Sequence, residues 1–461
     1  MPDQPRTMKP TASPLCEALT KQPFPADFVW GVATSAYQIE GAANEGGRGL
    51  SIWDVFAGQA GKVAGGDTGA VACDHYHRYR EDVALMQQLN IDAYRFSIAW
   101  PRVQPDGAGA WNEQGWDFYA RLLDALEEAG IGAHATLYHW DLPQALEDKG
   151  GWRNRDTAAR FADYAAEFAR RFGNRVKTIA THNEPLCTAM IGHEEGRFAP
   201  GLKDRKAAYQ VAHTLLLSHG LAMRAMRAVG ASAALGIVLN QSPAYPAAAT
   251  NDARAAARLA DAMMNRLFMD PLFRGAYPAD LLAHLGADAP DVQPGDMALI
   301  GAPMDFLGIN YYTRIWAGAA PGERTPSELG VTDMGWEIYP QGLTEHLVRI
   351  ARDYCPPPIY ITENGCACAD VLEGDAVHDS GRVDFLARHL EALRAAIALG
   401  ADVRGYFHWS LLDNFEWDSG YAKRFGLIYV DYATQRRVLK DSARWYAAYI
   451  TAQRNGATTQ G

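Results

Sequence analysis

Two segments, ALGIVLN at residues 234–240 and FLGINYY at residues 306–312, are apolar along almost their whole length. A strand with one face in water alternates apolar and polar residues. A continuous apolar run therefore predicts a strand of a parallel sheet that is covered on both faces. Six further apolar runs predict six more strands, at residues 28–37, 93–100, 133–140, 178–182, 359–362 and 403–409.

Amphipathic stretches separate the predicted strands. Their apolar residues recur at spacings of three and four, which predicts helices with one buried face. The clearest lie at residues 76–86, 116–126, 161–172 and 386–397. Eight strands alternating with helices predict a single α/β domain, a (β/α)8 or TIM barrel with elaborated loops at the carboxyl ends of its strands. The predicted boundaries are a polar, disordered tail at 1–22, the barrel domain at 23–450 and a polar C-terminal tail at 451–461.

Composition excludes several classes of protein. Of the 461 residues 48% are apolar, and 54 acidic against 43 basic side chains leave a net charge of −11. Because no basic block exists to neutralise phosphates, we expect no nucleic-acid partner. No apolar run suits a signal peptide or a membrane span, and six cysteines are too few for a disulfide framework. The sequence therefore predicts a cytoplasmic protein without a membrane partner, and it leaves the oligomeric state open.

No motif points to a metal or a cofactor. The segment GRG at residues 47–49 begins a dinucleotide-binding pattern, but Ile52 stands where the third glycine would be. The histidines of HYH at residues 75–77 would point apart on a helix. The cysteines of CAC at residues 366–368 lack the CxxC spacing of redox and zinc sites. We therefore expect no metal and no cofactor.

Polar and aromatic residues follow the apolar pattern at the carboxyl ends of six predicted strands. They are Gln38 and Glu40 after the first strand, His139 and Trp140 at the third, Asn183 and Glu184 at the fourth, Asn310 and Tyr312 at the sixth, Glu363 and Asn364 at the seventh, and Trp409, Glu416 and Trp417 at or after the eighth. Barrel enzymes build their sites at this end. Two long irregular segments, 41–73 and 319–336, also follow strand ends and are expected around the same opening.

Two glutamates dominate this set. Glu184 and Glu363 end the fourth and seventh predicted strands, which lie across the mouth of an eight-stranded barrel from each other. One carboxylate at a strand end has a plain structural use as a helix cap or an arginine partner. Two facing carboxylates among aromatic and amide side chains favour glycoside hydrolysis instead. In that reaction one acid protonates the leaving oxygen while the other carboxylate attacks or stabilises the sugar carbon.

The chain resembles family 1 of the glycoside hydrolases, the β-glucosidase family, from about residue 25 to residue 446. The resemblance rests on seven motifs in order: FVWG with QIEG at 28–41, DHYHRY at 74–79, YRFS at 94–97, NEP at 183–185, NYY at 310–312, TENG at 362–365, and the stretch from Trp409 to Trp417. It implies a retaining double displacement with Glu184 as the general acid/base and Glu363 as the nucleophile.

The resemblance also implies supporting roles. Asn183 would donate to the sugar 2-hydroxyl, and Arg95 and Tyr312 would keep Glu363 ionised. The remaining positions form the predicted sugar-binding ring: Gln38, His139, Trp140, Asn310, Tyr312, Trp409 as its floor, Glu416, Trp417 and Phe425. Loss of a proton from Glu184 would follow once the charge on Glu363 is removed in the covalent intermediate.

The predicted substrates are terminal, non-phosphorylated β-D-glucosyl residues of cellobiose, short oligosaccharides and aryl or alkyl glucosides, with β-galactosidase or β-fucosidase side activity. The pair Glu416-Trp417 is intact, and a carboxylate beside the sugar O6 would repel a phosphate. Lys423 and Arg424 are expected in an ion-paired turn, and His182 in the core. Two alternatives stay open: a transglycosidase, which uses an acceptor sugar or alcohol in place of water, and a glycan-binding protein without catalysis on the same barrel.

Overall fold

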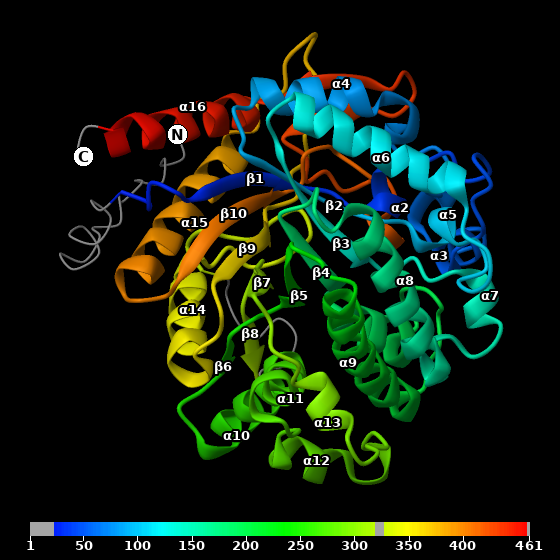
Figure 1. The fold of residues 1–461 in the computed structure, drawn as a ribbon. Coiled ribbons are helices and arrows are strands. Elements are labelled where there is room, and N and C mark those ends of the chain that lie inside the picture. The colour runs from blue at the N-terminus through cyan, green and yellow to red at the C-terminus, as the bar shows by residue number, and fades with distance from the viewer. Residues whose placement is uncertain (1–22, 319–326, 459–461) are drawn as a thin grey trace.

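The computed structural model describes residues 23–318 and 327–458, and its centre is the predicted closed parallel barrel (Figure 1). The strands follow one another around the barrel in the order β1-β10-β9-β7-β5-β4-β3-β2. Their bounds are Val29–Ala33 for β1, Ala93–Ser97 for β2, Gly132–Tyr138 for β3, Thr178–Asn183 for β4, Ala234–Asn240 for β5, Phe306–Asn310 for β7, Ile359–Asn364 for β9 and Val403–Trp409 for β10. The predicted N-terminal tail at 1–22 and residues 319–326 of the second predicted loop lie outside the described residues.

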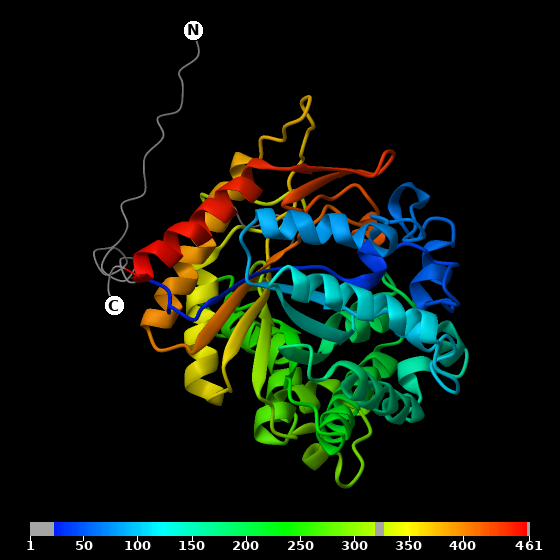
Figure 2. The same cartoon turned by 45° about the horizontal axis from the view of Figure 1, so that its top comes forward.

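Helices surround the barrel on its outer side, and α16 lies alongside α15 (Figure 2). The α-helices are α2 Ala36–Ile39, α3 Ile52–Ala57, α4 His75–Gln88, α5 Trp100–Val103, α6 Glu113–Glu128, α7 Gln144–Glu147, α8 Asp156–Phe172, α9 Arg205–Ala228, α10 Asn251–Asp261, α11 Leu267–Arg274, α12 Ala279–Leu285, α13 Asp296–Ile300, α14 Pro340–Tyr354, α15 Ser380–Ala398 and α16 Asp441–Thr458. Short 3-10 or π segments are η1 Ala64–Gly66, η2 Gly151–Arg153, η3 Cys187–Glu195, η4 Ala262–Arg266, η5 Gly286–Asp288 and η6 Trp417–Ser419. The four helical faces predicted from the sequence are those of α4, α6, α8 and α15.

Two small sheets lie outside the barrel. Strands β6 (Ala244–Pro246) and β8 (Ile315–Ala317) pair in parallel, whereas β11 (Ile428–Asp431) and β12 (Arg436–Leu439) form an antiparallel pair. The β6–β8 pair joins the loops that follow β5 and β7, so it ties together two neighbouring parts of the barrel mouth.

The two apolar segments that predict the parallel sheet are neighbours in it. Strands β5 and β7 pair with Gly236 opposite Phe306 and Val238 opposite Gly308. A Cβ atom on Gly236 would lie 2.3 Å from the Phe306 carbonyl oxygen and 2.8 Å from its ring. A Cβ atom on Gly308 would lie 2.6 Å from a methyl group of Val238. Each strand thus leaves room for a bulky residue of its neighbour inside the barrel.

The prediction of the first strand, 28–37, is wrong for residues 34–37. Strand β1 ends at Ala33, and Gln38 belongs to the short helix α2 instead of a strand end. The Ser35 hydroxyl donates to Gln38 Oε1 at 2.6 Å, and the Ala36 amide donates to the Ser97 hydroxyl of β2 at 2.7 Å. The local bond from Ser35 and the long-range bond to Ser97 stabilise a helical turn where the apolar pattern alone continues the strand. The second strand is likewise shorter than predicted, because α5 begins at Trp100.

The predicted domain boundary at residue 450 lies inside helix α16, whose last residue is Thr458. The buried side chains of Tyr446 and Ile450 anchor the first turns, and residues 451–455 beyond them are mostly exposed. Within the described ranges, no helix has both the length and the apolar character needed to cross a membrane.

We predict that Gly236→Ala destabilises the barrel. The added methyl group meets the backbone of Phe306, which cannot move aside without shifting β7, so the unfolding free energy should fall by about 1–3 kcal/mol. Midpoints of urea unfolding measure the change. Gly381→Ala in α15 is the matched control, because nothing lies within 4 Å of its added Cβ atom. A loss of stability in the control as large as in Gly236→Ala would contradict the packing argument.

Candidate active site

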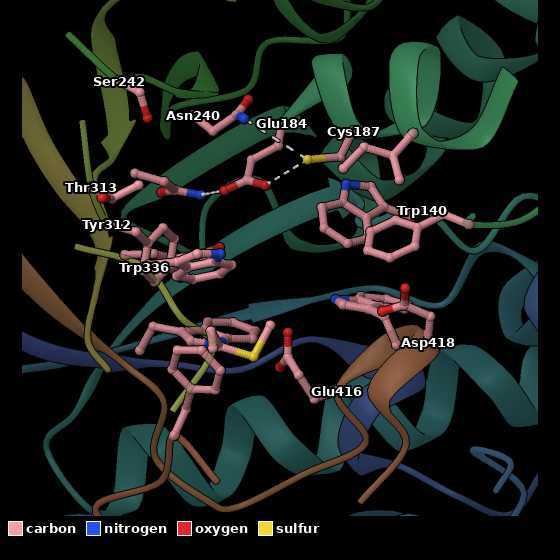
Figure 3. Close-up of a pocket in the computed structure, with 18 of the residues that line it drawn as sticks. Trp140, Glu184, Cys187, Asn240, Ser242, Tyr312, Thr313, Trp336, Glu416 and Asp418 are labelled. Atoms are coloured by element: carbon pink, nitrogen blue, oxygen red, sulfur yellow. Dashed lines mark hydrogen bonds between the residues drawn. The ribbon is translucent and has the colours of Figure 1, made fainter. Parts of the chain in front are cut away.

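A cavity of about 200 Å³ opens at the carboxyl ends of the barrel strands (Figure 3). Ten of the residues predicted from the sequence line it: His139, Trp140, Glu184, Asn310, Tyr312, Glu363, Trp409, Glu416, Trp417 and Phe425. Figure 3 shows Glu184 and Glu416 pointing into the cavity from opposite sides, with Tyr312 and Trp336 at one end and Trp140 at the other. The other three predicted residues, Gln38, Arg95 and Asn183, do not line the cavity and hydrogen-bond residues that do.

Glu363, the penultimate residue of β9, is held by a cation and a phenol. Arg95 on β2 donates to its Oε1 at 2.6 Å, and the Tyr312 hydroxyl donates to Oε2 at 2.7 Å. Burial raises the pKa of this carboxyl, and Arg95 and Tyr312 act in the opposite direction. Because Arg95 is 2% exposed and points at Glu363, the pair is a salt bridge inside the barrel, and we take Glu363 as ionised.

Glu184 follows β4, and no cation in residues 23–318 or 327–458 pairs with it. Asn310 donates to its Oε1 at 2.7 Å, and Cys187 Sγ lies 3.1 Å from Oε2. Burial and the charge of Glu363 raise the pKa of Glu184 to about 8. The two carboxyls therefore differ in protonation at neutral pH, because among the described residues only Glu363 has a cationic partner.

A chain of amide hydrogen bonds connects the two carboxyls. Arg95 donates to Asn183 Oδ1 at 2.7 Å, and Asn310 donates to the same oxygen at 3.0 Å. Asn183 Nδ2 is then the donor to His139 Nε2, at 3.1 Å. Burial and Arg95 lower the pKa of His139 well below its usual range. The ring is neutral, and its proton sits on Nδ1, which has no protein partner.

Glu416 is the third carboxyl of the cavity, and Gln38 lies behind it. Gln38 Nε2 donates to Asn414 Oδ1 at 3.0 Å, to the Phe415 carbonyl at 2.9 Å and, more weakly, to Glu416 Oε2 at 3.4 Å. Burial and the charge of Glu363 raise the pKa of Glu416 to about 8. At neutral pH Glu416 therefore carries a proton and can donate as well as accept hydrogen bonds.

Aromatic rings form two walls of the cavity. On one side Trp140 packs against Trp417 with ring centroids 4.5 Å apart. On the other, Trp336 packs against Tyr312 at 5.3 Å and Phe425 at 6.1 Å. Trp53, from the first of the two predicted irregular segments, supports Trp417 from behind at 4.6 Å. Rigid apolar walls beside polar groups suit a ring-shaped ligand that bears hydroxyl groups.

Sequence reasoning missed several lining residues. The cavity is also lined from the end of β5 by Asn240, Gln241 and Ser242, and the polar residues after this predicted strand were the available signal. Cys187 lies three residues after Glu184, within reach of its carboxyl group. Trp336 ends the predicted loop 319–336, and the aromatic character of that position was the available signal.

Three residues that are expected from the sequence in the core or in an ion-paired turn do not line the cavity. His182 is buried beside Phe161, with ring centroids 4.5 Å apart, and bonds to Ser218 at 2.7 Å. Lys423 pairs with Asp333 at 3.0 Å and Arg424 pairs with Asp413 at 2.7 Å. Among the described residues, no group of three or more histidine, cysteine, aspartate or glutamate side chains is arranged to hold a metal ion.

Comparison with known proteins places the chain among glycosidases. Residues 20–455 match the model of glycosyl hydrolase family 1. β-Glucosidase A of Acetivibrio thermocellus is 44% identical over 94% of this chain and 99% of its own. The bifunctional β-D-glucosidase/β-D-fucosidase of Bifidobacterium breve is 46% identical over 93% of this chain and 98% of its own. The structure of a β-glucosidase from Thermotoga maritima in complex with glucoimidazole superimposes with a TM-score of 0.91, at 44% identity over 94% of this chain and 99% of that one. The chain belongs to glycosyl hydrolase family 1.

Proposed function

We propose that the protein is a retaining β-glycosidase that removes terminal, non-phosphorylated β-D-glucosyl residues, as a β-glucosidase does. The observation that carries the proposal is the asymmetry of two buried carboxyls in one cavity: Glu363 is bound by Arg95, and Glu184 has no cation. Its relatives' names support the sugar, since one is a β-glucosidase and another acts on β-D-glucosides and β-D-fucosides. Cytoplasmic location stays a prediction from the sequence.

In the proposed mechanism Glu363 attacks the anomeric carbon while Glu184 gives its proton to the leaving oxygen. The glycosyl–enzyme ester removes the negative charge of Glu363, which is one of the two causes of the raised pKa of Glu184. The pKa of Glu184 then falls, and its carboxylate can take a proton from the attacking water. In this mechanism Asn183, whose Oδ1 accepts from Arg95, would donate to the sugar 2-hydroxyl.

The sugar-binding roles follow from the cavity wall. The sugar ring would lie above a floor formed by Trp409. Its hydroxyl groups and faces would form hydrogen bonds and stacking contacts with Glu416, Trp417, His139 and Trp140. The exclusion of phosphorylated sugars has a different cause from the one expected. Because Glu416 is protonated at neutral pH, the repulsion of a sugar phosphate would come from the other acidic groups of the lining. Arg197, a cation at this cavity, would offer a phosphate little attraction, because it is already paired with Asp418 at 2.8 Å.

The stereochemistry of the first product tests the retaining mechanism. Proton NMR of p-nitrophenyl β-D-glucoside during hydrolysis should show β-glucose first, with α-glucose appearing only as the sugar mutarotates. Release of α-glucose first would exclude Glu363 as the nucleophile. Absence of release from any β-glycoside, together with sugar binding in calorimetry, would favour the glycan-binding alternative. A product carrying an added acceptor sugar as the main outcome would favour the transglycosidase.

The acid role of Glu184 predicts a pH profile. Glu184 must be protonated in the free enzyme. The value of kcat/KM should therefore be highest at lower pH and fall as the pH rises through about 8. Glu184→Gln should remove this alkaline limb and lower kcat/KM for methyl β-D-glucoside roughly 10²–10⁴-fold. For dinitrophenyl β-D-glucoside, whose leaving group needs no proton, the bond-breaking step should change little.

Glu363→Gln is the control, because it should stop hydrolysis of both substrates. An unchanged alkaline limb in Glu184→Gln would assign the titration to another group.

A further inference from the structure

A pair of thiols lies just beyond the turn that follows Glu363. Cys366 is 2% exposed, whereas Cys368 is partly exposed, and their Sγ atoms are 3.8 Å apart. Both are free thiols. Because one sulfur is within reach of solvent and the other lies directly behind it, a mixed disulfide formed on Cys368 lies beside a second thiol.

A separate cavity of about 400 Å³ gives access to the pair. It is lined by Val331, Thr332, Asp333 and Ile338 on one side and by residues 366–369 with Gly381 on the other. Glu184, Glu363 and the sugar-binding residues do not line it, so this cavity is distinct from the candidate active site. Its volume admits the reacting end of a small molecule without any movement of the barrel.

Buried cations lie near the pair. Arg382 donates to the Cys366 carbonyl at 3.4 Å and pairs with Asp370 at 2.7 Å, and Lys440 also contacts Asp370. The hydrogen bond from Cys366, with support from Arg382 and Lys440, lowers the pKa of the Cys368 thiol. Cys368 is therefore the more nucleophilic sulfur, and Cys366 stays a protonated thiol until the second exchange step.

We propose that Cys366 and Cys368 form a modification site for small-molecule disulfides, which oxidise the pair to an intrachain disulfide and reversibly lower turnover. The loss of turnover rests on the proposed function, whereas the thiol chemistry does not. A metal is not the ligand we infer, because within the described ranges no third metal-binding side chain completes the site.

The reaction proceeds in two exchange steps. The Cys368 thiolate attacks one sulfur of the small disulfide, forms a mixed disulfide and expels the first small thiolate. The Cys366 thiol then loses its proton and attacks the Cys368 sulfur, which breaks the mixed disulfide and expels the second small thiolate. The two protein thiols are oxidised, one small disulfide is reduced to two thiols, and the two protons released by the cysteines go to those thiols.

The pair is connected to the sugar-binding wall through its backbone. Ala367, between the cysteines, packs in one cluster with Trp409 and Phe425. The Ala367 carbonyl accepts from the Asp333 amide at 3.0 Å, and the Cys368 amide donates to the Arg424 carbonyl at 3.1 Å, next to Phe425. Formation of the disulfide draws the sulfurs from 3.8 Å to about 2.05 Å. The backbone at Ala367 must adjust, and the cavity floor at Trp409 and the wall at Phe425, which pack in the same cluster, move with it.

The test uses the full-length protein with Cys355→Ser, a change at an exposed residue at the end of α14. In this variant the tryptic peptide 353–382 contains only the two thiols of the pair. After incubation with oxidised glutathione the peptide should lose the mass of two hydrogen atoms and carry no glutathione. The kcat/KM for p-nitrophenyl β-D-glucoside should fall roughly tenfold, as expected for a displaced pocket wall, and dithiothreitol should restore it.

Single variants in the same background separate the roles of the two sulfurs. Cys366→Ser should accumulate glutathione on Cys368, because the second step is blocked. Cys368→Ser should stay unmodified at the buried Cys366 and keep its activity under oxidation. The proposal would be overturned if peptide 353–382 retained both thiols after oxidation. It would also be overturned if activity fell only when glutathione was bound to Cys187. A disulfide that leaves kcat/KM unchanged would overturn its effect on turnover. If the reduced protein hydrolyses no β-glycoside, the proposed function fails, and the peptide mass still decides the thiol chemistry.

Discussion

The salt bridge between Arg95 and Glu363 is the interaction on which the site depends. Removing a carboxylate from water costs several kcal/mol, and here a buried guanidinium at 2.6 Å offsets that cost. The same guanidinium bonds the Asn183 side chain, which in turn orients His139 and shares its oxygen with Asn310. One buried cation therefore keeps Glu363 charged and orients the amides between the two carboxyls, whereas Glu184 pairs with no cation among the described residues.

The barrel and the polar residues at its strand ends could be predicted from local patterns in the sequence, whereas the roles of Arg95 and Phe425 came only from the family resemblance. The bounds of β5 match the predicted segment 234–240, since apolar continuity over seven residues has few other interpretations. Strand β1 is shorter than predicted because Ser35 and Ser97 make hydrogen bonds that hydrophobicity does not register. The position of Gln38 behind Glu416 could not be predicted, because these residues are far apart in the sequence. The contact between Cys187 and Glu184 is local, but it depends on the backbone turn after β4, which the apolar pattern does not describe.

Charge in the cavity is set by burial as much as by residue type. Glu184 and Glu416 are acids by composition, yet exclusion of water favours their neutral forms at neutral pH. A sequence shows that carboxyls are present and leaves open which of them hold protons. The consequence is a cavity that offers a sugar both donors and acceptors from glutamate side chains, without a metal ligand set among the described residues.

The cavity also has a closed inner end. Beneath Glu363 the barrel interior is filled by Arg95, Thr362 and the apolar residues around Phe306, and the space left there is only about 10 Å³. A chain therefore cannot thread through the barrel, and substrate must enter from the mouth at the carboxyl ends of the strands. In the proposed activity a long glucan would lose one unit at a time from a chain end. Its solution would stay viscous while free glucose accumulates, which is the opposite of what an enzyme with an open cleft produces.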